Sequence, residues 1–229
     1  MLRVTESGKH SRLVRCAECG HSFQMNRDRW QRLLATFALP ESNESFDRLV
    51  DAYSQPHRRY HTGAHIEHCL RTFDSASELA REPAEVELAL WFHDAIYDLY
   101  ASNNEAKSAD WACELLSLGG VGNERVERVR AHILATRHEA PAELDDSKLV
   151  VDIDLSILDV DEEAYARFET DVRQEYRWVP GPLFRSKRAE ILASFLARPT
   201  IYSTTAFRDR YEAPARRNLT AAITALRGE

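Results

Sequence analysis

A histidine and an aspartate stand side by side at the end of an apolar run, and together they could bind a metal. The pair is His93–Asp94, and it lies within the stretch Trp91–Asp98. Burying such a polar pair is costly unless it has a partner. A divalent cation is the simplest partner, because it binds an imidazole nitrogen and a carboxylate oxygen together. The structural alternative is a hydrogen-bonded pair that only ends a helix.

More histidines precede this pair. Four of the nine histidines lie within residues 56–68, and His65 is four residues after His61 and three before His68. A continuous helix would place these three side chains on one side. The segment does not read His-Glu-x-x-His, so the pattern of a zinc protease is not supported.

Two carboxylates lie inside a later apolar run. Asp152 and Asp154 are surrounded by Leu149, Ile153 and Ile157, whose spacing is typical of a helix. The strict alternation over Val151–Leu155 is typical of a strand, but the neighbouring segments are helical, so we predict a helix. A carboxylate in such a run needs a metal or a hydrogen-bond partner, since an unpaired one would be expelled or protonated.

The elements that must position these residues are predicted to be helices. Apolar residues recur at helical spacing between capping residues, prolines and glycines. The predicted helices cover about 26–39, 42–53, 62–79, 83–94, 102–118, 123–138, 149–160, 161–178, 185–196 and 207–226. We therefore predict an all-α fold with one domain over residues 25–229, preceded by a short irregular, flexible extension over residues 1–24.

Composition limits the class of protein. The 229 residues carry a net charge of -7 with no basic face, which argues against a nucleic-acid scaffold. No apolar run approaches the roughly 18 residues of a membrane span, and residues 1–15 lack the apolar centre of a signal peptide. The four cysteines do not form a disulfide pattern, and we expect a cytoplasmic protein. Cys16 and Cys19 have half of a zinc-site spacing; the alternative is a tail with two thiols.

Taken in order, His65, then His93–Asp94, then Asp152 or Asp154 resembles the HD superfamily of metal-dependent phosphohydrolases. The resemblance covers residues 28–222 and rests on Arg-x-Tyr-His-x-x-x-His-Ile (58–66), Phe-His-Asp-Ala-Ile-Tyr-Asp (92–98) and Asp-x-Asp-Leu-Ser-Ile-Leu (152–158). More narrowly, the chain is similar to a bacterial group of predicted HD phosphohydrolases. The motifs shared with that group are Asn-Glu-x-x-Ser-Ala (104–109) and the segment Ala215–Leu219.

The resemblance implies an HD-type helical bundle with a divalent metal held by His65, His93, Asp94 and Asp154. Asp152 is the alternate to Asp154, and a second metal would use His138 and His132. The cation could be Mn, Mg, Co, Zn, Ni or Fe.

Further residues receive catalytic or substrate-binding roles from the same resemblance. The catalytic candidates are Asp98, Glu105, Arg58 and His61, and the substrate-binding candidates are Tyr60, Arg185, Lys187 and Arg188. For Glu105 a capping box with Ser102 is the competing structural role.

The expected function is hydrolysis of a phosphomonoester or phosphodiester by a metal-activated water. We expect the ester to be part of a nucleotide. The alternatives are a di-iron oxygenase and a non-catalytic, metal-stabilised binding module. The expected partner is a small phosphorylated substrate, with no membrane partner; a homodimer is left open.

Overall fold

Helices make up most of the chain. The computed structural model describes residues 3–7, 11–15 and 22–228, with side chains from Met25 to Gly228. The chain divides into two compact units, Met1–Val151 and Asp152–Glu229, and the boundary falls inside one helix. The predicted all-α class is confirmed. The predicted domain limits at residues 24 and 25 stay a prediction.

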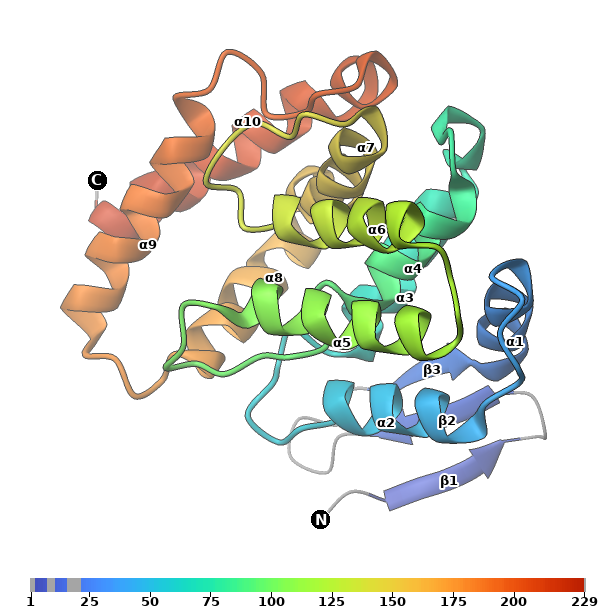
Figure 1. Ribbon diagram of the computed structural model, residues 1–229. Helices are drawn as coiled ribbons and strands as arrows, with labels where there is room; N and C mark the ends of the chain where they lie inside the picture. Colours follow the sequence, from blue (N-terminus) through green and yellow to red (C-terminus); the bar gives the residue numbers. More distant parts are fainter. Residues whose placement is uncertain (1–2, 8–10, 16–21, 229) are drawn as a thin grey trace. The chain divides into compact units, whose positions relative to one another are not determined.

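The first unit begins with strands, where the sequence had led us to expect irregular chain. β1 (Arg3–Ser7), β2 (Ser11–Arg15) and β3 (Ser22–Asn26) form an antiparallel sheet in the order β1-β2-β3 (Figure 1). These polar segments carry no clear apolar alternation, so pairing through the backbone left no signal in the sequence. β3 contacts α3 and leads directly into α1.

Six helices and most of a seventh follow in the described part of this unit. They are α1 (Arg27–Thr36), α2 (Asn43–Tyr53), α3 (Gly63–Asp74), α4 (Pro83–Phe92), α5 (Asn104–Leu118), α6 (Asn123–Ala135) and α7 (Asp145–Asp154), with a short 3-10 turn, η1 (Ser77–Leu79). Asn26, Ser42 and Thr62 each cap a helix by accepting a backbone N–H. These local signals explain why most helix starts agree with the sequence.

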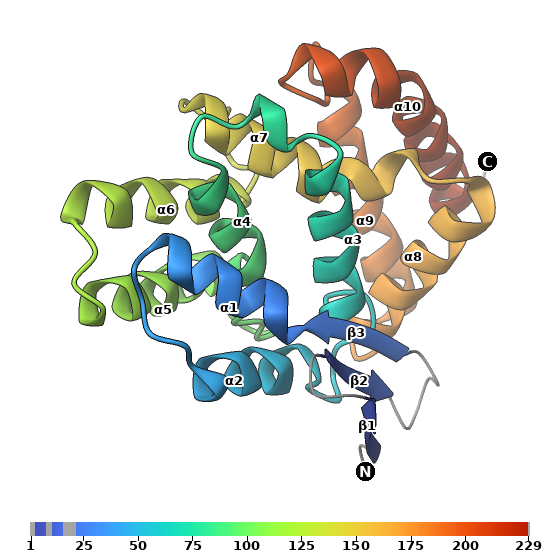
Figure 2. The ribbon, with the colours of Figure 1, turned by 90° about the vertical axis from the view of Figure 1, so that its right-hand side faces the viewer.

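The core of the first unit is built around α4. Val86, Leu88, Ala89, Leu90, Trp91 and Phe92 are each at most 1% exposed. α4 contacts α1, α3, α5 and α6, which surround it in Figure 2. A helix that is apolar on all sides is stable only when it is buried in this way. The burial of α4 fixes where its C-terminal end lies within this unit.

One charged residue is buried on α4. Glu85 is fully buried and accepts hydrogen bonds from Arg125 (3.0 Å) and Arg128 (2.8 Å) on α6. Burial alone would raise the pKa of Glu85, but these two guanidinium groups outweigh it and lower the pKa. The ion pairs therefore fasten α6 to the start of α4.

The second unit contains the end of α7, the 3-10 helix η2 (Leu155–Asp159), α8 (Glu162–Glu175), α9 (Gly181–Leu196) and α10 (Thr205–Arg227). α9 and η2 both contact α10. The Asn218 side chain donates to the carbonyl oxygens of Leu158 (2.9 Å) and Val160 (2.8 Å), which holds the end of η2 against α10. Among the described helices, none combines the length and apolarity that crossing a membrane requires.

Replacing Leu90 by alanine tests the central place of α4. Leu90 is fully buried, so Leu90→Ala should lower the free energy of unfolding by about 2–5 kcal/mol through lost burial and a residual cavity. Leu118, on α5, is 82% exposed and serves as the control, with an expected change within about 0.5 kcal/mol. Urea unfolding of both variants measures the difference, and equal effects would contradict this description of the core.

Candidate metal centre

The C-terminal end of α4 is buried, so its last carbonyl groups need donors from the protein. The last four carbonyls of a helix have no partner within the helix itself. Here the Ala89 oxygen accepts from the His93 backbone N–H (2.9 Å), and the Phe92 oxygen accepts from the Ala95 N–H (2.8 Å). The helix therefore ends at Phe92 with His93 as its C-cap, close to the predicted end at the His-Asp pair.

Side chains satisfy the other two carbonyls. The Tyr53 hydroxyl donates to the Trp91 oxygen (2.9 Å), and His93 Nδ1 lies 3.0 Å from the Leu90 oxygen. Because a carbonyl oxygen only accepts, Nδ1 of His93 must carry the hydrogen. In the neutral ring, Nε2 then carries the lone pair that a metal needs.

His65 faces this lone pair from α3. It lies in the first turn of that helix, and its Nε2 atom is 3.1 Å from His93 Nε2. On the other side of the ring, Nδ1 is 3.0 Å from the Tyr60 hydroxyl, which can either donate or accept. Tyr60 can therefore support the His65 tautomer that turns a lone pair toward His93.

Asp94 completes a triangle of donor atoms. Its Oδ2 atom is 3.2 Å from His93 Nε2 and 3.5 Å from His65 Nε2. Two ligand atoms of one cation, each bound at about 2.1 Å, lie about 3.0 Å apart at adjacent octahedral positions and about 3.4 Å apart in a tetrahedron. The three distances fit one face of such a coordination shell, so these residues could hold a divalent metal.

The electrostatics of Asp94 also suit a cation. Burial opposes its ionisation, but His93, His61 and His65 outweigh burial and lower the pKa of this carboxyl well below its usual range. The histidine side chains at positions 65 and 93 are 1% exposed, whereas the Asp94 side chain is 17% exposed. The carboxylate is thus ionised at neutral pH and is the part of the triangle that solvent can reach.

Arg58 holds the chain that carries Asp94. It is 1% exposed and donates to the carbonyl oxygens of Asp94 (2.8 Å), Ala95 (3.0 Å) and His61 (2.9 Å). A guanidinium engaged in this way positions the backbone of the pair. This geometry favours a positioning role for Arg58 over the predicted catalytic one.

His61 lies near the triangle, as its spacing from His65 indicated. Its ring stacks on Tyr97 at 4.2 Å between centroids and lies 6.3 Å from the His65 ring. The Tyr60 ring contacts both His61 and His65, at 4.8 Å in each case. His61, predicted as catalytic, and Tyr60, predicted as substrate-binding, thus pack together beside the donor atoms of the triangle.

Asp98 and Glu105 differ in their suitability as a base. α4 ends at Phe92, so Asp98 lies in an exposed loop, where Oδ1 accepts the Tyr100 N–H (2.9 Å). Glu105 is half-buried on α5, three residues before Ser108, whose Oγ accepts the Ile96 N–H (3.0 Å). Residues three apart share one side of a helix, so Glu105 lies on the side of α5 that meets the loop after Asp94.

The predicted capping box before α5 is wrong. The helix begins at Asn104 with Asn103 as its N-cap, and no side chain caps it. Asn104 instead exchanges hydrogen bonds with the backbone of Asp98, 3.0 Å in both directions. The alternative structural role of Glu105, in a capping box with Ser102, is therefore not observed.

Cys69 is a candidate that our sequence reasoning missed. It is fully buried on α3, and its Sγ atom is 3.7 Å from His65 Nε2. His65, Cys69 and His93 each offer a ligand atom within 4.8 Å of the others. Cys69 looks like an isolated thiol in the sequence, although its i+4 spacing from His65 was the available signal.

Asp152 and Asp154 lie in the second unit, at the end of α7. The predicted helix over this run is confirmed. Asp152 is fully buried, and its two oxygens accept the backbone N–H groups of Ser203 and Thr204, both at 2.7 Å. Burial raises the pKa of Asp152, and these hydrogen bonds oppose the rise. Its carboxylate thus holds the N-terminus of α10, whereas Asp154 is half-buried.

The three predicted anion-binding residues of the second unit lie on α9. Arg188 makes two hydrogen bonds to Glu169 (2.7 and 3.0 Å), and exposed Lys187 pairs with Glu190 (2.8 Å). Arg185 is exposed. Arg188 and Lys187 therefore have carboxylate partners that a substrate phosphate would have to displace.

The two residues predicted to bind a second metal, His132 and His138, lie outside the donor triangle. His132 is buried on α6, with Nδ1 2.8 Å from Ser147 Oγ, and burial lowers the pKa of its ring. His138 follows that helix in a left-handed conformation (φ 58°). Neither residue belongs to the His65–Cys69–His93 group. The proposed zinc residues Cys16 and Cys19 lie outside the described residues.

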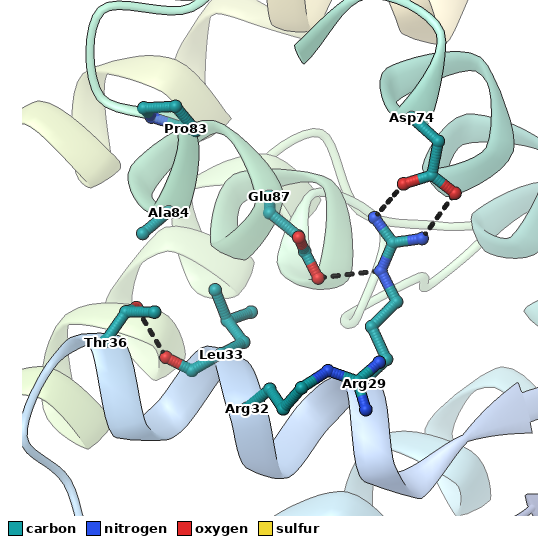
Figure 3. Close-up of a pocket in the computed structure, with 8 residues that line it drawn as sticks. All are labelled: Arg29, Arg32, Leu33, Thr36, Asp74, Pro83, Ala84 and Glu87. Carbon is teal, nitrogen blue, oxygen red and sulfur yellow. Dashed lines mark hydrogen bonds and ion pairs between the residues drawn. The ribbon is translucent and has the colours of Figure 1, made fainter.

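A pocket of about 430 Å³ lies elsewhere in the first unit. Its lining comes from α1, α4 and the end of α3 (Figure 3), and consists of Arg29, Arg32, Leu33, Thr36, Asp74, Pro83, Ala84 and Glu87. Arg29 bridges Glu87 (2.8 Å) and Asp74 (2.9 Å) across it. None of the predicted site residues lines this pocket, so it does not mark the candidate centre.

Exchanging Arg58 for methionine tests its positioning role. Arg58→Met removes the donor from three carbonyl groups, and each buried acceptor left without a donor costs about 1–3 kcal/mol. We expect the free energy of unfolding to fall by about 3 kcal/mol in a denaturant titration. The neighbouring Arg59 donates to the carbonyls of Pro56 and Arg58, and Arg59→Met should cost less than about 1 kcal/mol. Similar losses in both variants would count against the role of Arg58.

Comparison with known proteins adds no relative. No family model matches the chain, and no match was found among curated proteins or among solved structures. The chemistry of the centre therefore rests on its own residues.

Proposed function

We propose that this protein is a metal-dependent phosphohydrolase of the HD type, acting on a phosphomonoester or phosphodiester of a small molecule. The observation that carries the proposal is the donor triangle of His65, His93 and Asp94, with separations of 3.1, 3.2 and 3.5 Å. Two imidazoles and a carboxylate are a ligand set typical of hydrolytic metal sites. Nucleotides are the first substrate class to test.

Asp154 is proposed as the fourth ligand, on the resemblance to HD phosphohydrolases. The alternate, Asp152, already uses both carboxylate oxygens to hold Ser203 and Thr204. A carboxylate that accepts hydrogen bonds from a helix N-terminus is a poor metal ligand. If it bound a metal, the backbone N–H groups of that helix would lose their acceptor. The structure of the second unit thus favours Asp154 between the two.

The bound cation would polarise a phosphoryl oxygen and lower the pKa of a water molecule. Asp94 presents the solvent-accessible edge of the triangle, so substrate would approach from its side. Arg58 keeps Asp94 in place through the backbone, and the His93–Leu90 hydrogen bond orients the His93 ring so that Nε2 faces His65. Glu105, on the side of α5 toward the loop after Asp94, is the proposed base that takes the proton of the attacking water.

Removing the Asp94 carboxylate tests the centre directly. Asp94→Ala should lose bound metal and hydrolysis together, because the donor triangle would lose the carboxylate that offsets the charge of the cation. Metal content by elemental analysis, helical circular dichroism, and turnover of an aryl phosphate and a nucleotide panel measure the three properties. Asp98→Ala, whose carboxylate lies in the exposed loop, should keep its metal.

Each outcome of that comparison has a defined meaning. Full metal occupancy in folded Asp94→Ala protein would remove the central assignment. A wild-type protein that holds metal but hydrolyses no compound of the panel would contradict the hydrolase and favour a binding module. Two irons per chain with an EPR signal would favour an oxygenase.

Replacing Asp152 or Asp154 by asparagine should affect different properties: stability for Asp152 and metal binding for Asp154. Asp154→Asn should weaken metal binding at least about tenfold and shift the stability of the metal-free protein by less than about 1 kcal/mol. Asp152→Asn leaves one N–H of the α10 N-terminus without an acceptor and should cost about 1–3 kcal/mol with metal binding kept. Calorimetric metal titrations and thermal unfolding separate the two effects; the opposite pattern would assign Asp152 as the ligand.

A further inference from the structure

We propose that Cys69 is a ligand of this metal, and that its sulfur makes the centre prefer Zn²⁺ or Co²⁺ to Mg²⁺ or Mn²⁺. The inference rests on the metal site of the proposed function, but it does not require hydrolysis. It assigns a chemical class of cation to the centre, which the donor triangle alone leaves open.

Helix geometry brings Cys69 to the centre. Residues four apart on a helix lie one above the other, and Cys69 follows His65 by four on α3. Its Sγ atom is 3.7 Å from Nε2 and 3.8 Å from Nδ1 of His65, and lies within 4.8 Å of the ligand nitrogen of His93. The thiol is fully buried, so its surroundings are these donors rather than solvent.

The distance from the sulfur to Nε2 of His65 is one that two ligand atoms of a cation can have, and the similar distance to Nδ1 places Sγ beside the ring. A cation bound to sulfur at about 2.3 Å and to imidazole nitrogen at about 2.05 Å in a tetrahedron separates the two ligand atoms by about 3.6 Å. The observed 3.7 Å between Sγ and Nε2 of His65 agrees with this edge. In the first unit, one thiol and two imidazoles thus lie within 4.8 Å of one another, and the Asp94 carboxylate is 3.2 Å from the His93 imidazole.

The second buried cysteine shows what a thiol outside the centre looks like. Cys113 lies on α5, and its Sγ donates to the Val126 carbonyl oxygen at 3.7 Å. Burial raises the pKa of the Cys113 thiol. Cys113 is therefore a matched control: it is buried and reduced, in the same unit, with a carbonyl neighbour in place of two imidazoles.

Sulfur selects among cations by its softness. Thiolate ligands favour Zn²⁺ and related metals, whereas Mg²⁺ and Mn²⁺ prefer carboxylate, carbonyl and water oxygens. As the metal–sulfur bond forms, the thiol gives its proton to solvent, and neither metal nor sulfur changes oxidation state. A centre that includes Cys69 should bind Zn²⁺ and Co²⁺ far more tightly than Mg²⁺.

Cobalt spectroscopy on the full chain tests the assignment. In a Cys16→Ser/Cys19→Ser background, Co²⁺-loaded protein should show a near-ultraviolet sulfur-to-cobalt charge-transfer band. Cys69→Ser should abolish the band and weaken Zn²⁺ binding at least about tenfold, with a smaller change for Mn²⁺. Cys113→Ser should keep both the band and the affinities.

The possible failures are distinguishable. An unchanged band and unchanged Zn²⁺ affinity in Cys69→Ser overturn the role of Cys69, and the proposed metal site still stands if Asp94→Ala loses cobalt. A parent protein that binds no cobalt overturns both. If Cys69→Ser and Cys69→Ala do not fold, X-ray absorption of the zinc-loaded background protein decides: a sulfur neighbour at about 2.3 Å supports the proposal, and a shell of only nitrogen and oxygen contradicts it.

Discussion

The buried C-terminal end of α4 is the constraint on which the candidate centre depends. Its carbonyl groups cannot reach water, so the protein must supply donors. His93 is one of them: Nδ1 donates to Leu90, and for that reason Nε2 is left to face His65. The two interpretations of the His-Asp pair, helix end and metal ligand, are therefore compatible, because the two nitrogens of one ring serve one purpose each.

The distribution of charge follows from the same constraint. Arg58 is the buried cation beside Asp94, but it donates to carbonyl oxygens of the pair and its surroundings. The carboxylate of Asp94 therefore faces imidazoles. Burial penalises this carboxylate, and positive charge on the imidazoles around it offsets the penalty. A divalent ion at the triangle would supply that positive charge and give the three donors a common partner.

The sequence predicts the parts of this arrangement that depend on near neighbours. The apolar run of α4, its end close to the His-Asp pair and the helix starts at Asn26, Ser42 and Thr62 are local signals, and each is observed. The roles of Arg58 and Asp152 could not be predicted from near neighbours. Arg58 binds the Asp94 carbonyl 36 residues away, and Asp152 binds the Ser203 N–H 51 residues away. The predicted capping box before α5 is wrong for a local reason. The helix begins at Asn104, whose side chain makes two hydrogen bonds to the backbone of Asp98.

Asp152 and Asp154 show how one short motif can divide two tasks. A helix turns by roughly 100° per residue, so side chains two residues apart point in nearly opposite directions. Asp152 is directed at the backbone N–H groups of Ser203 and Thr204. Asp154 must then leave α7 on the other side, and both carboxylates cannot serve the same partner. Of the two, only Asp152 has both carboxylate oxygens engaged by the N-terminus of a neighbouring helix, which is why the proposal assigns the metal to Asp154.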